Sequence, residues 1–250
     1  MQFEEQLDAL TGAMQQHAQA CYPSEACGFV IAVGKKAVFR PAANVAQDPR
    51  DQFVIDHRDY AAAEDTGEIL AIWHSHPELT TAPSDADRAG CNMTELPWLI
   101  SSIRREAQGF VHDGPHLLSP DDWRAEYVGR PYVFGTFDCY SLLTDFYERE
   151  FAIKLHPFAE LRIRNWWGRG YDILGDNWAS QGFEPVTDGQ FEHGDLLLIA
   201  MDSSVANHVA IYVTGDIILH HLVNRLSRRE TFGPYWYSRV KLHLRHQTKC

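Results

Sequence analysis

Two histidines that lie two residues apart, His74 and His76, follow a short apolar run and form a natural pair of metal ligands. On a β-strand, residues two apart point to the same face, so both imidazoles can reach one ion. Pro77 ends the strand directly after them. Asp87 adds a carboxylate, and Ser84 falls on the same face of the first turn of a helix. Two imidazoles and one carboxylate leave a fourth tetrahedral position open, which is the ligand pattern of a catalytic zinc site.

Other residues near these histidines leave alternatives open. Asp85 competes with Asp87 as a ligand, and Cys91 is a soft donor by type, although a buried apolar thiol on the helix is the commoner situation. A histidine pair without partners is more often the exposed end of a strand. Glu25, in "YPSEACGF", offers a proton acceptor for a metal-activated water, but spacing alone does not fix its distance from the site.

The combined pattern resembles the JAMM (Mov34/MPN-plus) metalloprotease family over roughly residues 1 to 110. It consists of a glutamate, a histidine–serine–histidine–proline run, a serine and an aspartate, which here are Glu25, residues 74–77, Ser84 and Asp87. The resemblance implies a Zn²⁺ ion held by His74, His76 and Asp87. It also implies Glu25 as general acid/base and Ser84 as a hydrogen-bond donor to the oxyanion or the water. Family members cut peptide or isopeptide bonds.

Cys139, in "FGTFDCYSLL", marks a second candidate catalytic site. It opens a predicted helix, and a helix N-terminus stabilises negative charge and so favours the thiolate. A thiolate beside an imidazole is an acyl-transfer nucleophile. His208 begins one apolar strand and His220 ends the next; if these strands pair antiparallel, His220 can orient His208. Taken alone, Cys139 would more often be a packed core thiol, and His221 is the weaker of two adjacent histidines because neighbours on a strand point to opposite faces.

The segments "PYVFGTFDCYSLL", "HGDLLLIA" and "NHVAIYV…IILHHL" resemble the NlpC/P60 cysteine peptidases, which have a papain-like fold. The resemblance spans roughly residues 125 to 250. It implies Cys139 as nucleophile, His208 as base and His220 as orienting partner. Family members hydrolyse the amide between D-glutamate and a diamino acid in peptidoglycan stem peptides. Tyr140 and Ser141 stand where a serine and a glycine usually follow the cysteine, which bears on substrate preference.

The bulk composition excludes several classes of protein. The 250 residues carry a formal net charge of −12, which disfavours nucleic-acid binding. The most basic stretch, "NRLSRRE" at 224–230, is predicted to be a solvated strand edge or loop. No stretch is long and apolar enough to span a membrane, and "MQFEEQLDAL" has no signal-peptide pattern. The cysteines lack a disulfide framework and are expected to be reduced thiols: Cys21, Cys27, Cys91, Cys139 and Cys250.

The elements that must position these residues fall into two groups of unrelated pattern, which predicts an α+β protein of two domains. The first domain, 1–112, has predicted helices at 3–20, 57–65 and 84–93 and strands at 27–33, 36–42, 52–56, 68–73 and 96–103. The Gly-, Pro- and acid-rich stretch 113–124 is the predicted linker. The second domain, 125–250, has a predicted helix at 137–151, short helices within 163–183, and a meander of strands at 193–201, 207–215 and 216–222.

A JAMM-like domain followed by an NlpC/P60-like domain resembles the phage tail assembly family, the tail-tip proteins similar to K of lambdoid phages. The resemblance implies a zinc-dependent peptidase and a cysteine peptidase in one tail-tip assembly protein. Its implied partners are other tail-tip proteins and peptidoglycan stem peptides, and its implied locations are the host cytoplasm during assembly and then the virion tail tip. Two alternatives stay open: a structural assembly factor with vestigial sites, and a host metallopeptidase that processes a ubiquitin-like or sulfur-carrier protein.

Overall fold

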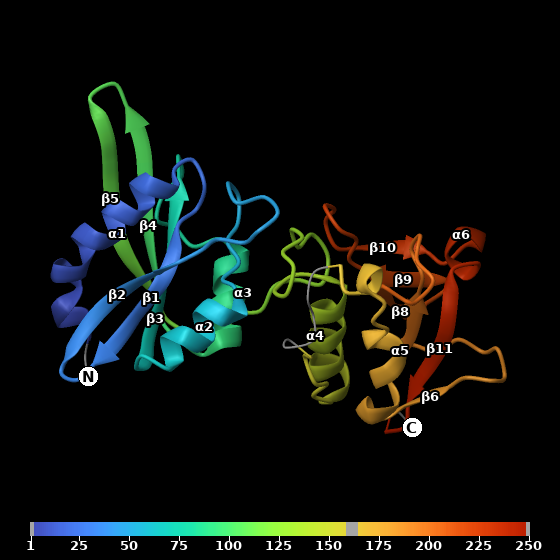
Figure 1. The fold of residues 1–250 in the computed structure, drawn as a ribbon. Helices are drawn as coiled ribbons and strands as arrows, with labels where there is room; N and C mark the ends of the chain where they lie inside the picture. The colour runs from blue at the N-terminus through green and yellow to red at the C-terminus, as the bar shows by residue number, and fades with distance from the viewer. Residues whose placement is uncertain (1–2, 159–164, 249–250) are drawn as a thin grey trace. The chain divides into compact units, whose positions relative to one another are not determined.

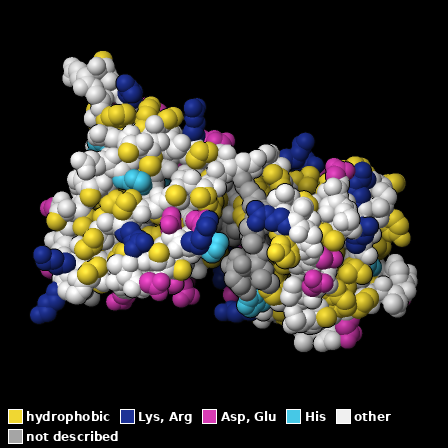
Figure 2. Space-filling model, viewed as in Figure 1, with side chains coloured by type: hydrophobic (Ala, Val, Ile, Leu, Met, Phe, Trp, Pro, Cys, Tyr) yellow, Lys and Arg dark blue, Asp and Glu magenta, His cyan; other side chains and the backbone are white. Residues whose placement is uncertain are grey.

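The computed structural model describes residues 3–158 and 165–248, and the chain divides into two compact units, 1–124 and 125–250 (Figure 1). Both units combine helices with a β-sheet, which confirms the predicted fold class. Among the described residues, no helix is long and apolar enough to cross a membrane. On the face seen in Figure 2, lysine and arginine side chains are scattered among acidic and apolar ones and do not gather in one patch.

The N-terminal unit is built on a five-stranded sheet with the order β2-β1-β3-β4-β5. Only the β3–β4 pair is parallel. The strands are β1 (Cys27–Val33), β2 (Lys36–Ala42), β3 (Glu68–Pro77), β4 (Trp98–Glu106) and β5 (Gly109–Leu118). The helical elements are η1 (Phe3–Gln6), α1 (Leu7–Cys21), α2 (His57–Glu64) and α3 (Asp85–Thr94).

Helices cover both faces of this sheet. Successive residues of β1 alternate between two cores: Val30 packs in the core that includes Met14 of α1, and Phe29 packs in the core that includes Ala63 of α2 and Cys91 of α3. Because both faces are buried, the strands read as nearly continuous apolar runs. The face covered by α2 and α3 also carries the side chains at the end of β3.

Two predictions for this unit are wrong. Residues 52–56 form no strand; Asn44 makes an isolated bridge with Ile55, and the Asn44 side chain accepts a hydrogen bond from the Val54 backbone at 3.1 Å. The predicted linker begins inside β5, since residues 113–118 pair with β4. Gly114 and Pro115 lie where the β4–β5 register shifts, so residues typical of a loop mark an irregularity within a strand.

The C-terminal unit is built on a six-stranded sheet with the order β10-β9-β8-β7-β11-β6, antiparallel throughout. Its strands are β6 (Phe183–Pro185), β7 (Asp195–Ile199), β8 (His208–Thr214), β9 (Ile217–His220), β10 (Arg228–Thr231) and β11 (Val240–His246). Its helices are α4 (Cys139–Phe151), η2 (Trp167–Arg169), α5 (Ile173–Asn177), η3 (Ala179–Gln181) and α6 (Pro234–Tyr237). The predicted meander is β7, β8 and β9, and the part of 163–183 that the structure describes forms short helices before β6.

Helix α4 packs its apolar side against one face of this sheet, with Leu143 and Phe146 in the same core as Leu198 and Val209. The other face carries Ala210 and Ile218 and is covered by Trp236 of α6. The packing fixes the start of α4 relative to β8 and β9.

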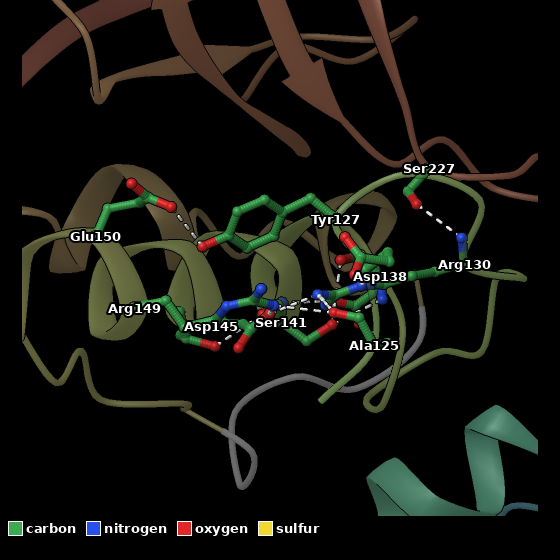
Figure 3. A network of polar contacts seen from close by, with 11 residues as sticks. Ala125, Tyr127, Arg130, Asp138, Ser141, Asp145, Arg149, Glu150 and Ser227 are labelled. Carbon is green, nitrogen blue, oxygen red and sulfur yellow. Dashed lines mark hydrogen bonds and ion pairs between the residues drawn. The ribbon is translucent and has the colours of Figure 1, made fainter. Parts of the chain in front are cut away.

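A buried arginine anchors the segment that leads into α4 (Figure 3). Arg130 donates through Nε to the Glu126 carbonyl at 2.6 Å and through Nη2 to the Ala125 carbonyl at 3.0 Å and to the Asp145 carboxylate. Its backbone N–H donates to Ser227 Oγ at 2.9 Å, and its carbonyl accepts from Ser227 N at 3.0 Å. Arg130 therefore ties α4 to the loop that precedes β10.

Arg130→Ala is expected to lower the free energy of unfolding of the C-terminal unit by roughly 3 kcal/mol, because it removes the cation from a buried ion pair. Hydrogen exchange of α4 amides under native conditions measures the change. Arg149→Ala is the matched control: Arg149 also contacts Asp145, at 3.3 Å, but its side chain is more exposed, and a loss below about 1 kcal/mol is expected. Equal losses in the two variants would contradict the structural role given to Arg130.

Candidate functional sites

His74, His76 and Asp87 converge in the N-terminal unit, from the end of β3 and the first turn of α3. His74 Nε2 lies 3.0 Å from His76 Nε2 and 3.1 Å from Asp87 Oδ1, and His76 Nε2 lies 3.3 Å from Asp87 Oδ2. All three residues are buried. Ligand atoms about 2.0–2.1 Å from a tetrahedral zinc ion stand roughly 3.3 Å apart. The spacing of the three donors fits one such ion.

The tautomer of His76 also suits a ligand. Its Nδ1 lies 2.8 Å from the Thr80 carbonyl oxygen, which can only accept a hydrogen bond. Nδ1 therefore carries the proton, and the lone pair of the neutral ring is on Nε2, directed at His74 and Asp87. This is how a backbone carbonyl commonly orients a metal-binding histidine.

Ser84 holds Asp87 in place through a capping box at the start of α3. Ser84 N and Ser84 Oγ both donate to Asp87 Oδ2 at 2.7 Å, and Asp87 N donates to Ser84 Oγ at 3.1 Å. Burial opposes ionisation, but His74, His76 and Ser84 hold the pKa of Asp87 well below its usual range. The single hydroxyl proton of Ser84 points to Asp87, and its donation to an oxyanion or water stays a prediction.

Glu25 lies beside this cluster because of strand register. Cys27, the first residue of β1, pairs with His74 of β3, and Ser75 N donates to the Ala26 carbonyl at 2.9 Å, so the pairing extends past the start of β1 and places Glu25 opposite His76. Directly opposed residues share a face of the sheet. Glu25 is buried, and burial raises its pKa to about 8, with His76 opposing the rise and Asp87 adding to it. The site thus contains a carboxyl group that can exchange its proton near neutral pH.

Sequence reasoning missed the aromatic wall of this cluster. The Phe53 ring stacks on His74 with centroids 4.6 Å apart, and Trp98 approaches the same imidazole edge-on at 5.5 Å. Cys91 is buried, with Sγ 3.3 Å from the Leu96 carbonyl oxygen, and belongs to the core. Asp85 is exposed and lies outside the cluster among the described residues.

In the C-terminal unit, Cys139 is the first residue of α4, presented by the N-cap Asp138. Asp138 Oδ1 accepts from the N–H groups of Tyr140 at 3.0 Å and Ser141 at 2.9 Å, and its Oδ2 accepts from Gly135 N at 2.8 Å. Gly135 has a φ of +89°, a conformation that favours glycine. These bonds hold the turn before the helix and place the thiol at the helix N-terminus, where negative charge is favoured.

Cys139 and His208 line the same cavity, which has a volume of about 290 Å³. Its polar lining includes Asn207 and Arg225, and much of the remainder is aromatic: Tyr132, Phe134, Tyr140, Phe158, Trp166 and Trp167. The aromatic pair at 166–167 is thus part of the cavity wall. The cavity brings the predicted nucleophile and base to one place.

A chain of side chains runs from His208 away from this cavity. His208 Nε2 lies 3.2 Å from His220 Nδ1, and His220 Nε2 lies 3.2 Å from Glu230 Oε2. Burial, followed by the neighbouring histidines His220 and His221, lowers the pKa of His208 to about 3. Sequence reasoning missed Glu230, although it lies in the charged stretch "NRLSRRE" that forms the edge strand β10.

The remaining candidates are His221 and the other cysteines. His221 is buried in the cavity wall, with Nε2 3.1 Å from the Arg225 carbonyl oxygen, and burial lowers its pKa to about 4. Cys21 and Cys27 are thiols of the N-terminal unit. Cys250 and the start of the aromatic segment, residues 163–164, lie outside the described residues.

Acid is expected to destabilise the C-terminal unit, because folding holds His208 and His221 neutral. Their folded-state pKa values, about 3 and about 4, lie below the ordinary value of 6.5. The unfolded chain therefore binds protons first as the pH falls, and stability that is complete above pH 6.5 is lost toward the folded-state values. Between pH 6.5 and pH 5, each histidine lowers the free energy of unfolding of the C-terminal unit by on the order of 2 kcal/mol.

Hydrogen exchange of β8 and β9 peptides as a function of pH measures this loss within the C-terminal unit alone. His221→Gln keeps a donor for the Arg225 carbonyl and should weaken the pH dependence. Protection factors, corrected for the intrinsic pH dependence of amide exchange, that stay constant between pH 6.5 and pH 5 in the parent would contradict the burial of two neutral histidines.

Comparison with known proteins adds the following similarities. The profile for prokaryotic homologs of the JAB domain matches residues 7–111, and the NlpC/P60 family profile matches residues 129–245. Tail tip assembly protein K of Escherichia phage N15 is 35% identical over 240 residues, covering 94% of this chain and 93% of that protein. Tail tip assembly protein K of Escherichia phage lambda is 34% identical over 192 residues, covering 76% of this chain and 87% of that protein. A solution structure of a Desulfitobacterium hafniense protein covers 42% of this chain and 86% of that chain at 24% identity, with a TM-score of 0.33 that is too low to bear on the fold.

Proposed function

This chain belongs to the tail tip assembly protein K family, and we propose that it is a phage tail assembly protein with two hydrolytic sites. Its JAB-like domain precedes its NlpC/P60 domain. The proposed activities are a zinc-dependent peptidase or isopeptidase in the N-terminal unit and a cysteine peptidase in the C-terminal unit. The cysteine peptidase would cut D-glutamate–diamino acid amides in peptidoglycan stem peptides. The observation that carries the proposal is the shared cavity of Cys139 and His208.

The cysteine site contains the groups that acyl transfer needs. His208 Nε2 is directed to His220, so Nδ1 is the ring nitrogen left to take the proton of Cys139 Sγ. The thiolate attacks the amide carbonyl, and the imidazolium then gives its proton to the leaving amine. Water hydrolyses the resulting thioester and releases the acid. Burial lowers the pKa of His208, so its imidazole is neutral before the reaction begins, and the imidazolium formed there needs a nearby negative charge.

The residues of the N-terminal unit fit a zinc ion, which His74, His76 and Asp87 would hold. A bound Zn²⁺ would supply a Lewis acid and increase the acidity of water at this position. Thr80 fixes the tautomer of His76, and Ser84 fixes the Asp87 carboxylate. Glu25 would accept or return a proton beside His76. The substrate of this site is a peptide or isopeptide bond.

The buried donor cluster favours an active metal site over a vestigial one. His74 is fully buried, and its Nε2 lies 3.0 Å from the Nε2 of a second buried imidazole and 3.1 Å from Asp87 Oδ1. Burying polar groups in this way is unfavourable without a ligand that compensates for it. Similarity to tail tip assembly proteins over 94% of the chain argues against a host enzyme for carrier proteins.

The proposed setting follows from the family. The protein is expected in the host cytoplasm during assembly and then in the tail tip of the virion, with other tail-tip proteins as partners. Digestion of purified peptidoglycan by the purified chain, with mass analysis of the released fragments, tests the proposed substrate.

A further inference from the structure

We propose that Glu230 is a positioning residue of the cysteine site, which sets the tautomers of His220 and His208 and stabilises the imidazolium formed there. The inference rests on the proposed cysteine peptidase function and adds a residue to it. Glu230 lies on β10, the edge strand of the sheet, and reaches the site through two neighbouring strands.

Strand register lines up these three residues. On β9, His220 pairs with Ala210 of β8 on one side and with Arg228 of β10 on the other. His208 lies two residues before Ala210, and Glu230 lies two residues after Arg228, so both are diagonal neighbours of His220 on the same face. The two contacts are therefore built into the sheet and do not depend on a mobile loop.

The tautomer of each ring follows from its partner. Arg228 Nη2 lies 2.5 Å from Glu230 Oε2, which favours the ionised carboxylate. An ionised carboxylate only accepts hydrogen bonds, so His220 Nε2 must carry a proton. Neutral His220 then has its lone pair on Nδ1 and accepts a hydrogen bond from His208 Nε2. The lone pair of His208 is left on Nδ1, which is the nitrogen that must act as base.

The carboxylate also compensates the charge that the reaction creates. When the S–H bond of Cys139 breaks and an N–H bond forms at His208 Nδ1, a thiolate and an imidazolium appear. His208 is 4% exposed and His220 is 1% exposed, and Trp236 covers His220 with ring centroids 4.7 Å apart. A buried imidazolium without a negative partner is strongly disfavoured.

We call the hydrogen-bonded series His208, His220 and Glu230 the relay. Without Glu230, the charged groups around the two histidines would disfavour an imidazolium there. Arg228 opposes an imidazolium at His220, and the neighbouring histidines His220 and His221 oppose one at His208. Glu230 is the carboxylate that is hydrogen-bonded to the relay itself. Removing its charge should therefore make the ion pair of Cys139 and His208 harder to form.

The test is the pH dependence of Cys139 alkylation by iodoacetamide in the full chain, followed by peptide mass spectrometry. Glu230→Gln should move the acidic limb of the Cys139 profile upward by about one pH unit, which is about a tenfold slower reaction at a fixed pH on that limb. Glu230→Asp keeps the charge and should retain most of the parent behaviour. Cys21, in the other unit, is the internal reference and should react alike in all three proteins.

A Cys139 profile that is the same in Glu230→Gln and the parent would overturn the proposal. Nitrogen NMR of the parent gives a second test that needs no variant: protonated Nε2 and unprotonated Nδ1 are expected on both His208 and His220, and the opposite tautomer on either ring contradicts the relay. Neither readout uses a peptide substrate. A shifted profile without peptidoglycan cleavage would refute the proposed substrate alone, and cleavage without a shift would refute the role of Glu230 alone.

Discussion

Cys139→Ala is expected to reduce the release of stem-peptide fragments from purified peptidoglycan by at least about 10³-fold. Cys139 is the proposed nucleophile, and the other described cysteines, Cys21, Cys27 and Cys91, belong to the N-terminal unit. The measurement is the rate of fragment release by the parent and the variant at equal protein concentration.

Glu25→Gln is the matched control for this experiment. Glu25 lies beside the metal cluster of the other unit, so its substitution should leave fragment release unchanged while it impairs any activity of the N-terminal site. If Cys139→Ala still releases fragments at the parent rate, the cysteine site is not the one that cuts the cell wall. If Glu25→Gln alone stops release, the metal site is responsible.

The second large effect is expected in metal content. The parent should bind about one zinc ion per chain, and His74→Ala should bind almost none, because one of three buried ligands is lost and His76 and Asp87 cannot complete the site. Elemental analysis of protein purified without added metal measures the ratio of zinc to chain.

His57→Ala provides the control for the metal measurement. His57 starts α2 with its side chain 84% exposed and lies outside the cluster, so its removal should leave the zinc content at the parent level. Equal zinc in the parent, His57→Ala and His74→Ala would refute the assignment of the ion to these residues.

The candidate metal cluster was predictable in part, because the spacing rule for its two histidines is local. Residues two apart on a strand share a face, so His74 and His76 could be paired from sequence, while the choice of Asp87 over Asp85 came from the resemblance to the JAMM family. The place of Glu25 depends on how β1 pairs with β3, which no local pattern specifies. The direction of the Ser84 hydroxyl proton could not be predicted from the sequence either. In the structure, Ser84 Oγ donates to Asp87.

The edge strand of the second sheet could not be identified from its own residues. Strand β10 reads "RRET", with no apolar alternation, and is a strand because β9 offers it a partner. The stretch was predicted to be a solvated strand edge or loop, and nothing in it singled out Glu230. The opposite error occurs at β5, where Gly114 and Pro115 suggest a linker but lie at a register shift within a paired strand. The stretch around Phe53 has strand-like residues, yet it pairs through an isolated bridge and through the Asn44 side chain, which accepts from Val54 N.

We propose that the chain carries two independent reaction centres, one on sulfur and one on a metal. Mass analysis of peptidoglycan fragments, made with the parent protein before and after zinc removal, tests it most directly. If the two centres act independently, the same D-glutamate–diamino acid amide is cut at the same rate in both preparations. Loss of cleavage on zinc removal, or fragments cut at any other bond, would contradict it.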